Sequence, residues 1–110
     1  MPGTTVRRAV LDLLRAEGVT TVFDNPGSTG LTFLADWPRD LRYVLGLQEA
    51  SVVAKANGFA QGSRGPAFVN LHSAAGVGHA LGSVFTAFRN QTPLVITAGQ
   101  QARSLLPLAP

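Results

Sequence analysis

The sequence contains no cysteine, which excludes disulfide bonds, thiolate chemistry and zinc sites of the usual thiolate-bound kind. It also contains no apolar run of the roughly 18 residues that a membrane-spanning helix requires. The N-terminal segment MPGTTVRRAV lacks the apolar centre of a signal peptide. From these absences we expect a soluble, cytoplasmic protein with no membrane partner.

Charged residues are also scarce. They make up 14% of the chain, whereas 45% is hydrophobic, and the net charge is +3. The basic residues are scattered, apart from the neighbours Arg7 and Arg8, whereas a nucleic-acid-binding face needs them clustered. We therefore expect no nucleic-acid partner. A chain this apolar and this short is better suited to burying surface against further polypeptide or a partner subunit.

Short apolar segments alternate with segments of helical periodicity along the 110 residues, which allow one domain at most. The expected helices run from Thr4 or Thr5 to Glu17 and over residues 31–37, 49–61 and 77–88. The expected strands cover residues 19–23, 42–47, 67–71 and 94–98. This alternation predicts an α/β fold, a parallel sheet of about four strands with helices on both faces.

Residues with reactive or hydrogen-bonding groups follow the end of every expected strand. In open α/β sheets, ligands bind beyond the carboxyl ends of the strands, where the strand order reverses. The residues are Asn25, Pro26, Gly27 and Ser28 after the first strand, Gln48 and Glu49 after the second, His72 and the run SAAGVG after the third, and Gly99, Gln100 and Gln101 after the fourth. Together they predict a catalytic or cofactor-binding edge.

Each of these residues also has a structural interpretation. The NPGS segment is a turn motif in which Ser28 can cap the next helix. Glu49 can be a first-turn acid that the helix dipole stabilises. His72 can be a hydrogen-bonded structural histidine, and His79, inside an expected helix, is structural or exposed. The loop at Gly76 could cradle a phosphate, but the full dinucleotide fingerprint is absent. Their shared location favours a functional site.

Four segments carry a family resemblance, namely VFDNPGS, RYVLGLQEASVV, PAFVNLHSAAGVGHALG and TPLVITAGQQ. From about Thr4 to Arg103, the chain resembles the N-terminal, pyrimidine-binding domain of thiamine diphosphate-dependent enzymes. QEA is shared across that superfamily, whereas NLHSAAG together with TPLVITAGQQ is specific to the benzoylformate decarboxylase-like branch. The resemblance implies non-oxidative decarboxylation of a 2-oxo acid to an aldehyde and carbon dioxide.

The resemblance also implies roles for the matching residues. Glu49 matches the glutamate that hydrogen-bonds the N1′ nitrogen of the cofactor's aminopyrimidine, and we expect desolvation to raise its pKa. His72 matches a histidine that helps with proton transfer, and Ser28 matches a serine near the substrate carboxylate. The residues expected to contact thiamine diphosphate are Glu49, Asn25, Pro26, Gly27 and Gly76.

The remaining parts of such a site are expected from other polypeptide. In this family the diphosphate and its magnesium ion are bound by another domain, supplied by a second subunit, so the resemblance implies a homo-oligomer with its site at a dimer interface. The GDG motif of that second domain does not occur in this sequence. We therefore expect residues 1–110 to be an incomplete pyrimidine-binding domain that is inactive alone.

Two other interpretations remain open. The chain could be a separate subunit of a split thiamine diphosphate enzyme, or a non-catalytic remnant that serves as an interaction module. The chain departs from the family pattern at several positions, of which Asp24, Lys55 and Asn57 favour the latter. Asp24 replaces a usual glycine and is expected to add negative charge close to the substrate. Lys55 is unusual in a helix expected to be largely buried, Asn57 replaces an acid, and His79 replaces a common asparagine.

Overall fold

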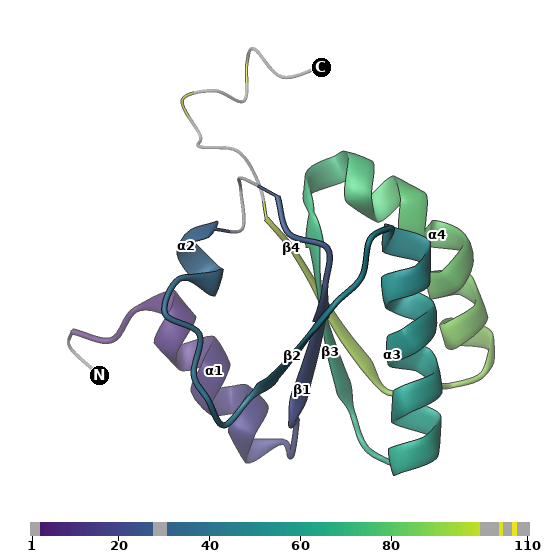
Figure 1. The fold of residues 1–110 in the computed structure, drawn as a ribbon, viewed down its shortest axis with the longest axis horizontal. Coiled ribbons are helices and arrows are strands. Elements are labelled where there is room, and N and C mark those ends of the chain that lie inside the picture. Colours follow the sequence, from purple (N-terminus) through teal and green to yellow (C-terminus); the bar gives the residue numbers. More distant parts are fainter. Residues whose placement is uncertain (1–2, 28–30, 100–103, 105–106, 108–110) are drawn as a thin grey trace.

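A computed structural model describes residues 3–27, 31–99, 104 and 107. Its helices are α1 (Val6–Ala16), α2 (Leu31–Leu34), α3 (Glu49–Ser63) and α4 (Ser73–Arg89). Its strands are β1 (Thr21–Asp24), β2 (Arg42–Leu45), β3 (Ala67–His72) and β4 (Leu94–Gly99). Helices and strands alternate in the predicted order, and the predicted α/β fold with about four parallel strands is confirmed (Figure 1).

The strands form one parallel sheet in the order β2-β1-β3-β4. From β1 the chain moves to β2 on one side and then crosses to β3 on the other. The strand order therefore reverses between β1 and β3, which is where ligands bind in sheets of this kind. The carboxyl ends of these two strands, at Asp24 and His72, mark the place where a site is expected.

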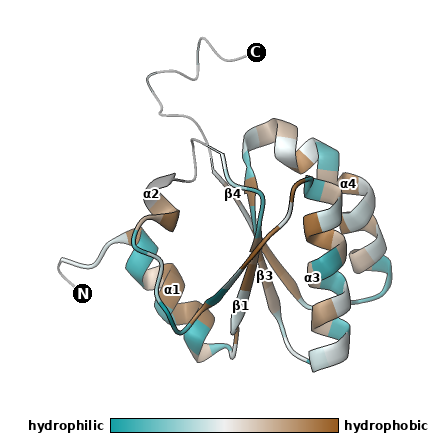
Figure 2. Ribbon diagram, in the orientation of Figure 1, coloured by the Kyte–Doolittle hydropathy of each residue, from teal (hydrophilic) through white to brown (hydrophobic). Residues whose placement is uncertain are grey.

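Helices cover both faces of the sheet, with α1 and α2 on one side and α3 and α4 on the other (Figure 1). Successive residues of a strand point to opposite faces. Accordingly, Val22 and Phe68 pack in the cluster that contains α1. Their neighbours Phe23 and Val69 pack with α3 and α4. Burial on both faces explains the hydrophobic colouring of the central strands in Figure 2.

Arg7, half of the basic pair noted in the sequence, fixes the segment around α2. Its guanidinium donates hydrogen bonds to three main-chain carbonyls, those of Phe33, Ala35 and Asp36, at 2.8, 2.7 and 3.0 Å. A tilted contact between the rings of Phe33 and Trp37, with centroids 5.8 Å apart, adds to the packing on this side. The Arg7 charge therefore has a structural role in joining α1 to α2.

Helix α4 begins at Ser73 and not near residue 77, so the predicted loop SAAGVG is wrong. The chain turns from strand to helix within one residue, because Ser73 adopts a left-handed backbone with φ of 49°. Gly76 and Gly78 consequently lie inside the helix. The sequence suggested a loop because two glycines lower helix propensity by about 1 kcal/mol each, a cost that tertiary packing can outweigh.

The expectation that Lys55 lies in a largely buried helix is also wrong. Helix α3 buries one face only, through Val52, Val53, Ala56 and Ala60, and Lys55 lies on its exposed side. Asn57 is half-buried and accepts a hydrogen bond from the Gln61 side chain at 3.0 Å. None of the helices in the described part of the chain has the length and apolar character needed to cross a membrane.

Candidate functional site

The described site residues gather at the carboxyl ends of β1, β2 and β3. They are Asn25, Pro26 and Gly27 after β1, Glu49 at the start of α3, and His72 and Gly76 around the start of α4. Three further predicted residues, Ser28, Gln100 and Gln101, lie outside the described residues. The edge predicted from the strand ends therefore exists, and its members come from elements on both sides of the reversal in strand order.

Glu49 is held in place by the way α3 begins. Gln48 has an extended backbone, and its side-chain Oε1 accepts a hydrogen bond from the N–H of Ser51 at 3.1 Å, which caps the helix. Gly46 allows the preceding turn to pass close to Val52, since a Cβ at this glycine would overlap the valine side chain. Glu49 thus occupies the first helical position, where the helix dipole stabilises a carboxylate.

Both carboxylate oxygens of Glu49 have partners from other elements. Asn25, just beyond β1, donates from Nδ2 to Oε2, and Nδ1 of His79, in α4, lies 2.9 Å from Oε1. These contacts lower the pKa of Glu49, with the hydrogen bond from His79 as the largest cause. The expectation of a raised pKa is therefore wrong. The Glu49 side chain is only 12% exposed, but its two hydrogen bonds stabilise the charged form more than burial destabilises it.

Two glycines lie against the side chains of His72 and Glu49. The His72 ring lies against the backbone of Gly27, where a Cβ would overlap it. A Cβ at Gly76 would lie 3.4 Å from Cγ of Glu49 and 3.8 Å from Cβ of His72, so this position is in ordinary packing range of both side chains. The segment after β1 thus meets Glu49 through Asn25 and His72 through Gly27.

His79 is a member of the site that the sequence pattern did not indicate. Its side chain is 65% exposed, which agrees with the expectation of an exposed residue, but its ring contacts the best candidate for catalysis. The feature of the sequence that could have indicated His79 is its helical spacing from Gly76 and Ser83. Gly76, His79 and Ser83 share the face of α4 that meets the start of α3, and the Ser83 hydroxyl donates to the carbonyl of Ala50 at 2.9 Å. Of these three residues, only Gly76 lay outside the helix expected over residues 77–88.

Asp24 does not add a free negative charge to the site edge, contrary to expectation. Its side chain is fully buried on the α1 side of the sheet. It accepts hydrogen bonds from the Tyr43 hydroxyl at 2.8 Å and from Nδ2 of Asn70 at 3.3 Å. The Thr97 hydroxyl in turn donates to Oδ1 of Asn70 at 2.9 Å. We call these four residues the cross-sheet ladder, since each belongs to a different strand.

The cross-sheet ladder sets the protonation behaviour of Asp24. Burial raises the pKa of its carboxyl, while hydrogen bonds from Tyr43, Asn70 and the backbone of Asn25 partly oppose that rise. The same neighbourhood raises the pKa of the Tyr43 phenol, because burial and the adjacent carboxylate disfavour a phenolate. Both groups thus favour their neutral forms more than in water.

Asp24→Asn is expected to change the pH dependence of stability. Because the folded pKa is raised, folding favours the protonated acid, so the contribution of Asp24 is fully present below about pH 4 and is lost as pH rises through the folded pKa. The asparagine variant lacks this titration. Urea unfolding of both proteins between about pH 4 and pH 7 should show the wild type losing stability relative to the variant. A difference that stays constant with pH would contradict the assignment.

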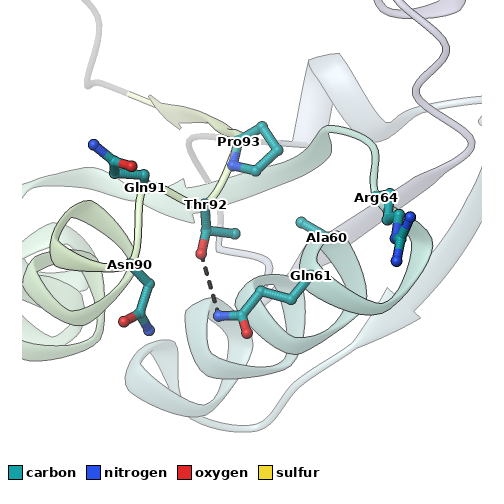
Figure 3. A pocket seen from close by; sticks show the side chains of 7 residues that line it. All are labelled: Ala60, Gln61, Arg64, Asn90, Gln91, Thr92 and Pro93. Atoms are coloured by element: carbon teal, nitrogen blue, oxygen red, sulfur yellow. Dashed lines mark hydrogen bonds between the residues drawn. The ribbon is translucent and has the colours of Figure 1, made fainter.

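A separate concave region lies at the opposite end of the sheet, where α3 ends and β4 begins (Figure 3). It has a volume of about 510 Å³ and is lined by Ala60, Gln61, Arg64, Asn90, Gln91, Thr92 and Pro93. Nε2 of Gln61 donates across it to the Thr92 hydroxyl at 3.3 Å. Its lining has no carboxylate and no imidazole, the side chains most often used for acid–base catalysis.

Comparison with known proteins agrees with this arrangement. Residues 4–108 match the family model described as thiamine pyrophosphate enzyme, N-terminal TPP binding domain. The chain is 56% identical over 102 residues to a benzoylformate decarboxylase from Pseudomonas aeruginosa, covering 93% of this chain and 19% of that protein. It therefore spans about a fifth of the length of this relative.

Solved structures give the same result. The crystal structure of benzoylformate decarboxylase from Polynucleobacter necessarius superposes with a TM-score of 0.90 at 57% identity, over 96% of this chain and 20% of that one. A thiamine diphosphate-dependent 4-hydroxybenzoylformate decarboxylase from Rhodococcus jostii gives a TM-score of 0.90 at 47% identity, with the same coverage. The chain therefore belongs to the thiamine pyrophosphate enzymes and corresponds to their N-terminal TPP-binding domain.

Proposed function

We propose that this chain is the N-terminal, cofactor-activating part of a thiamine diphosphate-dependent decarboxylase that acts on a 2-oxo acid of the benzoylformate type. The observation that carries the proposal is the position of Glu49, an ionisable group at the reversal in strand order, on an edge that also holds Asn25 and His72. Two relatives named as benzoylformate decarboxylases, at 56% and 57% identity, support the substrate class.

The residues present suit an aminopyrimidine. Both carboxylate oxygens of Glu49 accept hydrogen bonds from nitrogen atoms. A carboxylate can accept a hydrogen bond from a protonated ring nitrogen in the same way, so Glu49 would bind the N1′ side of the ring. When bound, thiamine diphosphate supplies an electron sink for decarboxylation, which no side chain can supply. The chain's own contribution is to orient the ring through Glu49 and to exchange a proton with it there.

The other predicted residues take supporting roles in the proposal. His72, held against Gly27, would give and take protons near the reacting carbon, since imidazole titrates close to neutral pH. Asn25 would fix the Glu49 carboxylate. Pro26 and Gly27 would shape the loop that presents Ser28 to the substrate carboxylate, and Gly76 would leave space for the cofactor beside Glu49.

The diphosphate and magnesium would be held by a separate domain from another subunit of a homo-oligomer. Within the described residues, no group of three or more acids and histidines could hold a metal ion. The chain also exposes a stripe of large apolar side chains on α4, with Leu81, Phe85 and Phe88 being 57%, 63% and 76% exposed. Such a stripe, on a chain that spans a fifth of its relatives, supports packing against further polypeptide.

A chimera tests the proposed function. The aligned N-terminal residues of the Pseudomonas aeruginosa benzoylformate decarboxylase are replaced by those of this chain, and carbon dioxide release from benzoylformate is measured with thiamine diphosphate and magnesium. We expect the chimera to decarboxylate benzoylformate and the 110-residue chain alone to release none.

Three outcomes separate the open interpretations. Activity of the chimera supports the proposal. Activity that also appears when the chain and the remaining domains are mixed as separate polypeptides supports a split enzyme. A folded, cofactor-binding chimera that releases no carbon dioxide contradicts the proposal and favours a non-catalytic module.

A further inference from the structure

We propose that His79 is a positioning residue that competes with thiamine diphosphate for Glu49, so that its ring must leave the carboxylate before the cofactor's pyrimidine can be bound. This inference rests on the proposed function, since it concerns how Glu49 becomes available to the cofactor. It starts from the contact of Nδ1 of His79 with Oε1 of Glu49 at 2.9 Å.

The two partners of Glu49 differ in how firmly they are held. Asn25 is half-buried, and its own backbone N–H bonds to the Asp24 carboxylate, which belongs to the cross-sheet ladder. The backbone of Asn25 is therefore anchored to a buried network. His79, in contrast, has a side chain that is 65% exposed, so its ring can rotate into solvent at little cost in packing.

This difference assigns different roles to the two carboxylate oxygens. Oε2, bonded to Asn25, stays anchored to the end of β1. Oε1, bonded to His79, is the oxygen that an incoming N–H donor or ring nitrogen can reach by replacing the imidazole. A ligand that needs Oε1 gains one hydrogen bond to Glu49 and displaces another, so its net affinity is reduced by the strength of the contact with His79.

The surroundings of the pair keep the carboxylate in place once the ring has moved. Glu49 begins α3 beneath the cap made by Gln48, and the buried Gly76 of α4 lies against its side chain. The neighbouring Ser83 ties α4 to α3 through the carbonyl of Ala50, one turn beyond His79. Displacement of His79 therefore needs a side-chain rotation only and no shift of a helix.

The first test measures Glu49 itself in the cofactor-free 110-residue chain. His79→Phe keeps a ring at the position but removes its nitrogen atoms. We expect the pKa of the Glu49 carboxyl, followed by carbon-13 NMR, to rise in this variant, because the hydrogen bond from His79 is the largest cause of its lowering. Ser83→Ala is the matched control on the same face of α4, and we expect it to leave the Glu49 titration unchanged.

The second test measures thiamine diphosphate affinity of the chimera by calorimetry in the presence of magnesium. A hydrogen bond contributes about 0.5–1.5 kcal/mol net, so His79→Phe should tighten binding by about 2- to 12-fold. Unchanged or weaker binding, or an unchanged Glu49 titration, would overturn the inference, since loss of a merely structural histidine would not tighten cofactor binding. A chimera that binds the cofactor without decarboxylating would instead refute the proposed function and leave the affinity comparison valid.

Discussion

Glu49→Gln in the chimera is expected to slow exchange of the cofactor's C2 proton by about 10²–10⁴-fold, the usual contribution of a positioned acid–base group. Glutamine fills the same space and can keep one bond to Asn25, so the fold and the cap of α3 should survive. What it cannot do is exchange a proton with a ring nitrogen. Hydrogen–deuterium exchange at C2, measured by NMR in quenched samples, reports this step without depending on the substrate.

The chain provides its own control for this substitution. Glu17 is its other glutamate, exposed at the end of α1 and located before the amino end of β1, whereas the site lies beyond the carboxyl end of that strand. Glu17→Gln removes the same charge, so it should leave C2 exchange within about twofold, as expected for a surface change. Normal exchange in the Glu49 variant would remove this residue from the proposed mechanism.

Phe68→Ala is expected to lower the free energy of unfolding of the 110-residue chain by about 3–5 kcal/mol. The Phe68 side chain is fully buried in β3, packs with Leu11, Leu14 and Val22, and lies 6.1 Å from the ring of Phe33. Its removal leaves a cavity on the α1 side of the sheet. Because single domains are stable by only about 5–15 kcal/mol, this is a large fraction of the total, and urea titration measures it directly.

Phe88 offers a matched comparison. It is the same residue type in α4, but it is 76% exposed. Phe88→Ala should change the free energy of unfolding by no more than about 0.5 kcal/mol, since little burial is lost and alanine favours a helix. Similar losses for both variants would mean that the cluster around Phe68 does not form the core described above.

The sequence predicted the sheet and its edge because those features depend on local patterns. Apolar strands such as residues 67–71 and helical spacing in residues 49–61 set the alternation, and parallel connections bring all the strand ends to one edge. The family resemblance then singled out Glu49, and the matched family model agrees with that resemblance.

What the sequence could not predict depends on contacts between elements. His79 pairs with Glu49 because α4 is oriented with this side chain facing the start of α3. The helix leaves β3 through the left-handed backbone at Ser73, which the sequence pattern did not indicate. Burial of Asp24 depends on β1 extending one residue beyond the expected strand, which turns its side chain to the α1 face. The pKa of Glu49 was mispredicted for the same reason. Its position in the sequence suggests burial, which raises the pKa of a carboxyl, but the hydrogen-bond donors that lower this pKa come from other elements.

The cross-sheet ladder has a consequence for how the strands find their alignment. Side chains alternate between faces along a strand, so a slip of one residue would turn Asp24 towards the apolar cluster of α3 and α4, away from Tyr43 and Asn70. Burying an acid without hydrogen bonds costs several kcal/mol, even when it is neutral. Apolar strands alone would tolerate such slips more readily. The ladder therefore selects one register for β1 against both neighbours, and that register brings Asn25 to Glu49.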